Sequence, residues 1–358
     1  IKPIEGIMKK ILLVLVSFLL ITCDNSVSSN DTENSSWVFI ANEGGFNSSN
    51  GTVSMIDQFD NIIETEILGD VVQSVKVYND KLIVLINNNQ KIIYFDINSD
   101  GINNQQELII NDSPREMEII NNKGYISTWD PDWLVYGTTP GNVIVLNLET
   151  YEIENSIEVG IMPEGLLYSQ GFLWVANSGD STLSKIDINN NIVVENIEIG
   201  RGPQNLIEHE SKIYVSRTFY DNEYDENGYW INTVTTHGSS KIDNDQVIIN
   251  NYGNGVVCGG SVLSYNNNVY RSFSGGISPL NEDLSLDESA RIGSYNQNEV
   301  YHVEIINDNV WFSIIPLDDY GYPSNEISEV KVLDSNGEEI SNYIVGINPG
   351  DFTYWTSN

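Results

Sequence analysis

Basic residues are scarce in this sequence. It contains 16 lysines and arginines against 51 aspartates and glutamates, which gives a formal net charge of −35. Proteins that bind nucleic acid or anionic lipid headgroups need a basic surface to meet the phosphates. We therefore exclude nucleic acid as a partner and expect a small molecule, a glycan or another protein instead.

Cysteines and histidines are also few. Cys258 is the only cysteine after Cys23, so the intervening and following chain cannot form a disulfide and depends on a hydrophobic core. The three histidines, His209, His237 and His302, form no H-x-H or H-E-x-x-H pair. No nucleophile elbow, Walker loop or haem-attachment motif is present either, so enzymatic motifs are lacking.

No apolar run is long enough to cross a bilayer, which takes about 20 residues. The longest, Ile11–Ile21, follows Lys9 and Lys10, and this order is typical of an export signal. The run ends in Leu20-Ile21-Thr22-Cys23, which resembles the lipobox of bacterial lipoproteins, where the cysteine is lipidated. The alternative is an ordinary cleaved signal with an incidental cysteine.

Three segments are predicted on this basis. Residues 1–23 comprise some upstream residues and the lipoprotein signal, residues 24–36 form a polar, flexible tether, and residues 37–358 form the folded domain. A lipid on Cys23 would fix an exported monomer to the bacterial cell envelope, at the outer membrane or cell surface. The anchor is then the only contact with the membrane.

The folded segment contains a weak repeat of roughly 40 to 55 residues, a period typical of β-propellers. Its clearest copy, Pro163–Gly200, contains four β-rich segments separated by Gly, Asn or Asp. The second of these segments recurs seven times, beginning at Phe39, Leu82, Tyr125, Trp174, Tyr214, Tyr270 and Trp311. The sequence therefore predicts an all-β propeller with seven four-stranded blades, with six or eight blades as alternatives.

The order of the segments predicts how the ring closes. Folded sequence begins at Trp37 with a second strand, whereas Asp351–Trp355 near the C-terminus has the character of a first strand. If the two segments share one blade, no sheet edge is left open.

Three motifs resemble the YVTN-repeat propellers of surface-layer type and related lipoproteins. These are Trp174-Val175-Ala176-Asn177, Gly202-Pro203 before a strand, and Asn42-Glu43-Gly44-Gly45-Phe46. The resemblance covers nearly all of the chain after Trp37. It implies an exported recognition module and provides no catalytic residue, because propellers host many functions.

Long insertions between second and third strands predict a binding face. They occur at Ser127–Gly141, Arg217–Gly238 and around Tyr320, and loops on a rigid scaffold commonly carry binding sites. Aromatic and acidic residues concentrate there; the candidates are Trp129, Asp130, Asp132, Trp133, Tyr136, Tyr220, Tyr224, Tyr229, Trp230 and Tyr320. The alternative is that these rings pack on one another and only hold the loops.

Residues just after each blade connection are expected to line the rim of the central channel. The candidates are Arg115, Glu164, Asn205 and His302, with Glu116, Gln204, Cys258 and Asp351 beside them.

A calcium site is predicted in DINSDGINNQQE. Asp96, Asn98, Asp100 and Glu107 have the D-x-N-x-D-G-x5-E spacing that supplies oxygen ligands on a tight turn. The alternative is a simple hairpin turn rich in Asn and Asp.

The preferred function is a binding module of the cell envelope, whose ligand meets the aromatic, acidic loops. A structural surface-layer or adhesin-like component is the first alternative. The second is a lactonase-like hydrolase or lyase that uses the channel, for which His302 with Glu304 or Glu164 is the best pair of titratable groups.

Overall fold

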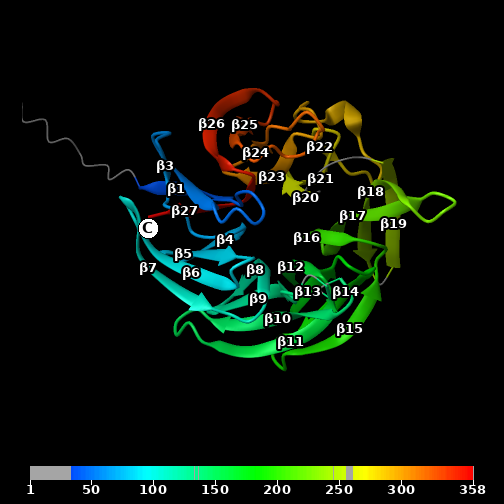
Figure 1. Cartoon of the computed structure of the whole chain (residues 1–358), viewed down its shortest axis with the longest axis horizontal. Coiled ribbons are helices and arrows are strands. Elements are labelled where there is room, and N and C mark those ends of the chain that lie inside the picture. The colour runs from blue at the N-terminus through cyan, green and yellow to red at the C-terminus, as the bar shows by residue number, and fades with distance from the viewer. Residues whose placement is uncertain (1–33, 133, 136, 245, 255–260, 358) are drawn as a thin grey trace, which may run out of the picture. The chain divides into compact units, whose positions relative to one another are not determined.

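The computed structural model describes residues 34–132, 134, 135, 137–244, 246–254 and 261–357. One compact unit extends from Ser35 to Asn358. It is a ring of seven antiparallel sheets, as Figure 1 shows, which confirms the predicted seven-bladed propeller. No helix among these residues is long and apolar enough to span a membrane.

The first strand of every blade lies at the centre of the ring, where it contacts the first strands of both neighbouring blades. In blade order these strands are β27 (Pro349–Thr356), β4 (Val72–Tyr78), β8 (Ser113–Ile120), β12 (Pro163–Ser169), β16 (Pro203–His209), β20 (Val262–Tyr265) and β23 (Val300–Ile306). Their side chains therefore line the channel.

The second and third strands form the buried middle of each blade, and their sequences are correspondingly β-branched and apolar. The second strands are β1 (Ser36–Asn42), β5 (Lys81–Ile86), β9 (Lys123–Trp129), β13 (Phe172–Asn177), β17 (Lys212–Tyr224), β21 (Asn268–Phe273) and β24 (Asn309–Ile314). The third strands are β2 (Thr52–Asp57), β6 (Lys91–Asn98), β10 (Pro140–Asn147), β14 (Thr182–Asp187), β18 (Trp230–Asp243), β22 (Gly276–Pro279) and β25 (Ile327–Leu333).

The outer strands are more exposed, as expected for the edge of a blade. They are β3 (Ile62–Glu64), β7 (Gly101–Ile109), β11 (Ile153–Ile161), β15 (Ile192–Glu198), β19 (Gln246–Asn254) and β26 (Glu339–Ile347). In the described part of the chain the sixth sheet has three strands, one fewer than the other blades. Beside β22 lie the isolated bridges Ile277–Ile292 and Leu280–Leu286 and the short 3-10 helix η1 (Glu288–Ala290).

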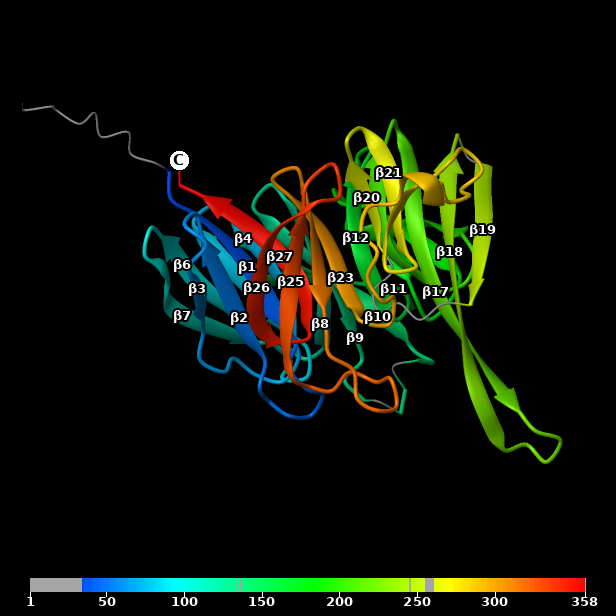
Figure 2. The same cartoon turned by 90° about the horizontal axis from the view of Figure 1, so that it is seen from above.

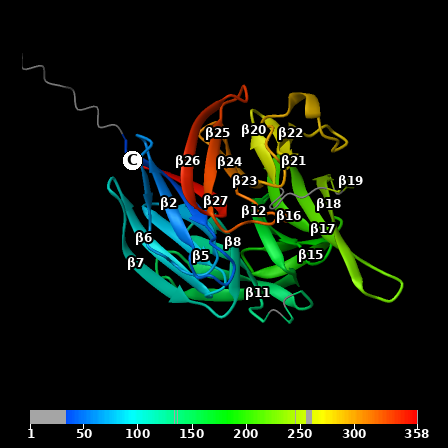
Figure 3. The same ribbon diagram turned by 45° about the horizontal axis from the view of Figure 1, so that its top comes forward.

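The two ends of the propeller meet in the first blade. β27 pairs antiparallel with β1, from Ser36 opposite Thr356 to Asn42 opposite Pro349. In Figures 1 and 3 the red β27 lies beside the blue β1. The predicted closure of the ring is confirmed.

The hydrophobic core consists of seven clusters, one between each pair of neighbouring blades. The interface between the fifth and sixth blades also buries two arginines. Arg271 is 0% exposed and donates to backbone carbonyls, among them those of Gly238 and Arg217. Burial lowers the pKa of Arg271 to about 10. We interpret these guanidinium groups as structural, since they satisfy backbone carbonyls that the blades leave unpaired.

Candidate functional site

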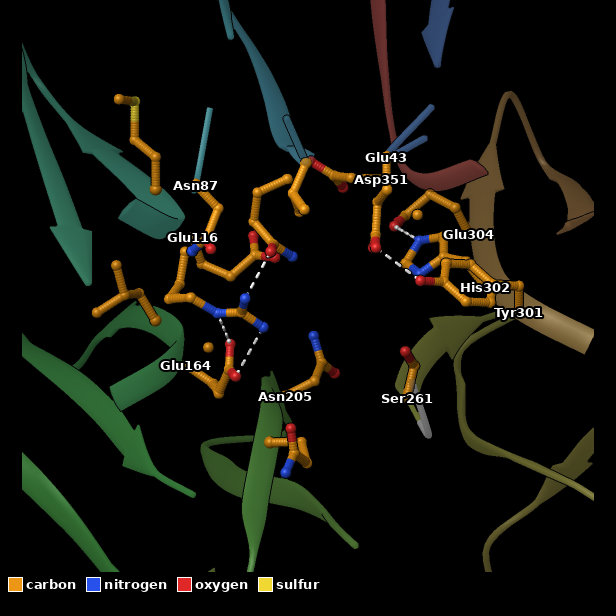
Figure 4. Close-up of a pocket in the computed structure, with 18 of the residues that line it drawn as sticks. Glu43, Asn87, Glu116, Glu164, Asn205, Ser261, Tyr301, His302, Glu304 and Asp351 are labelled. Atoms are coloured by element: carbon orange, nitrogen blue, oxygen red, sulfur yellow. Dashed lines mark hydrogen bonds and ion pairs between the residues drawn. The ribbon is translucent and has the colours of Figure 1, made fainter. Parts of the chain in front are cut away.

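A cavity of about 1150 Å³ occupies the channel at the end where the blades are connected. Each of the seven first strands contributes lining residues, and the loops after β1, β5 and β9 contribute Gly44, Asn88 and Asp130. Figure 4 shows the polar side chains that point into it. A site of this size holds a small molecule.

The structure places the four predicted channel-rim residues in the lining. Arg115, Glu164, Asn205 and His302 all border the cavity. So do Glu116, Gln204 and Asp351. Cys258 lies outside the described residues.

Arg115 is held by groups of the protein itself. Its Nε and Nη2 donate to the two carboxylate oxygens of Glu164 at 3.1 and 2.9 Å, and its Nη1 donates to Gln73 Oε1 at 2.6 Å. The guanidinium carbon also lies 4.1 Å from the ring centroid of Trp129. All three nitrogens are therefore engaged, and Arg115 is poorly placed to receive an anionic ligand.

A second group of charges lies around Asp351 on β27. Its Oδ2 accepts from Ser74 Oγ and from the Val75 backbone N–H, both at 2.8 Å, and lies 3.6 Å from Lys76 Nζ. Burial raises the pKa of Glu116 to about 8, with repulsion from Asp351 adding to the shift. Burial by itself would lower the pKa of Lys76. The negative charges of Asp351 and Glu116 together have a larger effect and raise the pKa of this lysine.

The third group lies beside Asp351, across the cavity from Glu164, as Figure 4 shows. Tyr301 donates to Glu43 Oε2 at 2.6 Å, yet burial still raises the pKa of Glu43. His302 Nε2 lies 3.4 Å from Glu304 Oε2. Burial works to lower the pKa of His302, but Glu304, Asp351 and Glu116 raise it overall.

Negative charge is in excess in this cavity. Seven carboxylate side chains line it, those of Glu43, Glu116, Glu118, Asp130, Glu164, Glu304 and Asp351. The basic side chains that line it are Lys76, Arg115 and His302. Burial raises the pKa values of Glu43, Glu116, Glu118 and Glu164, and repulsion from other carboxylates adds to the shift for Glu43 and Glu116. Such a site attracts positive charge.

The sequence analysis missed Glu43, Lys76, Glu118 and Tyr301. A signal for two of them was present, because side chains two residues apart on a strand face the same side. Glu118 follows Glu116 by two positions, and Lys76 occupies the corresponding place in β4. This spacing could not identify Glu43 or Tyr301. Glu43 lies in the loop after β1, and Tyr301 is one residue from His302, not two.

Only part of the predicted loop face borders the cavity. Trp129 and Asp130 line it, and Trp129 Nε1 donates to the Pro163 carbonyl at 2.9 Å. Asp132 is exposed and caps the Leu134 backbone N–H at 3.0 Å. Trp133 and Tyr136 lie outside the described residues.

The predicted loop in the fifth blade is instead a long β-hairpin. β17 and β18 stay paired from Ile213–Ile242 out to Tyr224–Trp230. Figure 2 shows the hairpin projecting from the face that carries the loops between second and third strands. Its exposed aromatic residues are Tyr220, Tyr224, Tyr229 and Trp230, and none of them lines the cavity. Tyr320, in a separate loop, is 86% exposed and does not line it either. The predicted binding face is thus divided: Trp129 and Asp130 line the cavity, whereas the hairpin residues and Tyr320 are exposed outside it.

Shortening this hairpin is expected to leave the propeller intact. We expect replacement of Tyr220–Thr235 by an Asn-Gly turn to change the free energy of unfolding by less than about 1 kcal/mol, because exposed side chains and exposed ion pairs such as Arg201–Asp221 contribute little. Urea unfolding of both proteins tests this. A loss of several kcal/mol would show that the hairpin is part of the core.

The predicted calcium ligands are not brought together. Asn98 pairs with Gly101 across a two-residue turn, so the segment is the alternative hairpin. Asp96 forms an ion pair with Lys81, whereas Glu107 lies further along, opposite Ile93, with Lys91 3.1 Å from its carboxylate. Asp100 follows Asn98, whose Oδ1 accepts from the Asp100 backbone N–H. The strand register separates the carboxylates that an EF-hand loop would gather.

No protein family model and no curated protein matches the sequence. Solved structures do match. A functionally unknown protein from Desulfotomaculum acetoxidans gives a TM-score of 0.60 at 13% identity, over 90% of this chain and 99% of that one. A proposed 6-phosphogluconolactonase from Bacteroides fragilis gives 0.60 at 11%, over 91% and 99%. AztD from Citrobacter koseri gives 0.51 at 10%, over 91% and 99%.

At these identities the likeness shows the fold alone. Membership of the YVTN-repeat propellers therefore stays a prediction.

Proposed function

We propose that this protein is an exported, lipid-anchored binding module that takes a small, positively charged ligand into the central channel. The observation that carries the proposal is the excess of carboxylates in the cavity, seven against Lys76, Arg115 and His302. Keeping buried carboxylates close together costs stability, and a protein tends to retain such a cost where the site is used. A ligand with one or more amines would relieve it.

An anionic ligand fits this cavity poorly. Arg115 is occupied by Glu164 and Gln73, and Lys76 lies against Asp351. A sugar phosphate, the substrate class that the name of the Bacteroides fragilis neighbour implies, would meet uncompensated carboxylates. A hydrolase remains the second candidate, favoured by the 3.4 Å approach of His302 and Glu304. A purely structural role gives no reason for the charge excess.

Thermal unfolding with a set of ligands tests the proposal. In EDTA-containing buffer, we expect at least one of putrescine, spermidine and choline to raise the unfolding midpoint, because a ligand of the folded state stabilises it by mass action. Glucose 6-phosphate and neutral oligosaccharides should not. The shift should be smaller in Glu116→Gln, measured against its own ligand-free midpoint, and unchanged in Glu107→Gln, whose carboxylate lies on β7 outside the cavity.

Two results would overturn this function. One is a shift with the sugar phosphate alone, which would favour a lactonase-like role. The other is an equal shift with amines in the wild type and in Glu116→Gln, which would place the amine elsewhere on this acidic protein.

A further inference from the structure

Three potential metal ligands meet on one wall of the cavity. His302 and Glu304 are two residues apart on β23, so both face the channel, and Asp351 approaches from the neighbouring first strand, β27. One ligand atom from each lies within 4.8 Å of the others. Figure 4 shows the three side chains directed toward one another. Among the described residues this is the one group of three or more His, Cys, Asp and Glu side chains with that spacing.

Surrounding groups already hold two of these side chains in place. Asp351 is 4% exposed, and its Oδ2 is fixed by Ser74 Oγ and the Val75 N–H. Both of these hydrogen bonds end on Oδ2, so they do not occupy Oδ1. The His302 ring packs edge-on against Phe352, with centroids 5.3 Å apart at 86°. Metal sites typically show this kind of outer support, because it orients the ligands before the ion arrives.

The structure assigns to His302, Glu304 and Asp351 a binding site for a divalent transition-metal ion, with zinc as the best fit. One imidazole nitrogen and two carboxylate oxygens form a donor set that suits zinc, whereas calcium and magnesium prefer sites built only from oxygens. Three protein ligands leave a fourth position of a tetrahedral ion open to the cavity. The ion would be exchangeable and accessible to a second ligand.

Lys76 competes with the ion. Its Nζ lies 3.6 Å from Asp351 Oδ2 and supplies part of the positive charge that a metal would bring. Replacing it with methionine leaves the carboxylates without this cation and keeps a side chain of similar length. We therefore expect Lys76→Met to bind zinc more tightly than the wild type does. A merely structural cluster gives no reason for tighter binding.

Equilibrium dialysis of the protein against zinc alone, without a histidine tag and after EDTA treatment, tests the site. Atomic spectroscopy should find one zinc per chain, with calcium and magnesium bound at least about tenfold more weakly. His302→Ala and Glu304→Gln should each weaken zinc binding by at least about tenfold. His209→Ala is the matched control, since this histidine also lies on a first strand, β16, but does not line the cavity.

Cobalt provides an independent reading of coordination. The visible absorption of the cobalt-loaded protein should change in His302→Ala and stay the same in His209→Ala. Zinc binding at background in the wild type, or binding in both His302→Ala and Glu304→Gln that equals the wild type, would overturn the site. Glu304→Gln is nearly isosteric, so it keeps the test decisive if His302→Ala does not fold. This inference goes beyond the proposed function, because amine binding can fail while zinc still binds.

Discussion

Replacing Trp355 with alanine is expected to lower the free energy of unfolding by about 3 to 5 kcal/mol. Trp355 lies in β27, is 6% exposed and belongs to the cluster between the first and second blades, with Trp37 and Val75. Its Nε1 also donates to Asp80 Oδ1 at 3.0 Å. Removing the indole leaves a void in the core beside β1 and β27, the two strands that close the propeller. Urea unfolding followed by circular dichroism measures the loss of unfolding free energy.

Trp230→Ala is the matched control for this prediction. The substitution is the same, but Trp230 is 60% exposed on the hairpin, so we expect a change of less than about 0.5 kcal/mol. Equal losses in the two variants would show that closure through β27 does not stabilise the propeller as its packing implies.

Stability is expected to fall as the pH rises from about 5 to about 8. Glu116 has an ordinary pKa of 4.5 when exposed, whereas burial and Asp351 raise its pKa to about 8 in the folded protein. Between these values the folded chain holds a proton that the unfolded chain has released, so raising the pH favours unfolding. The raised pKa of His302 acts in the same direction, because the stability it contributes is lost as the pH rises through its folded value.

Glu116→Gln isolates the contribution of one carboxylate. It should be more stable than the wild type at pH 8.5, by about 2 kcal/mol, since each pKa unit is worth about 1.4 kcal/mol and the site is partly solvated. At pH 5 the two proteins should differ little. Urea unfolding at both pH values in EDTA measures this, and a constant difference between them would contradict the raised pKa.

The blades could be predicted from the sequence because their middle strands are buried on both faces. Segments such as Trp174-Val175-Ala176-Asn177 are apolar and β-branched, and this composition repeats in all seven blades. The outer edge of the sixth blade could not be predicted. There, isolated bridges such as Ile277–Ile292 take the place of a fourth strand. Isolated bridges do not require the alternation of apolar and polar residues by which a strand is recognised in a sequence.

Two segments have a different local structure from the one expected, because turn chemistry was undervalued. Ser99-Asp100 is a two-residue hairpin turn between Asn98 and Gly101, and it determines the structure of the segment that was interpreted as a calcium loop. The insertion after Arg217 is rich in Tyr, Thr and Val on both sides of Asp225–Gly228, which favours a second hairpin.

The position of the cavity could be predicted, but its charge pairing could not. Arg115 and His302 were located because they follow blade connections, which all lie at one end of the channel. The contacts that define the site run between blades, such as Arg115 with Glu164 and Tyr301 with Glu43. They depend on which side chains face each other across the channel, and this is a property of the closed ring.

The strand that closes the ring also brings Asp351 to the cavity, and this has a consequence for how the protein matures. Asp351 and Ser74, which hold each other at 2.8 Å, are 277 residues apart in the chain. Contacts of such long range form late in folding, because the chain must first pay the entropy of closing a very large loop. During synthesis Asp351 can reach its partners only after the strands of all the other blades have been made. A chain truncated before Asp351 would therefore lack this carboxylate and its contact with Ser74, and its cavity would be incomplete.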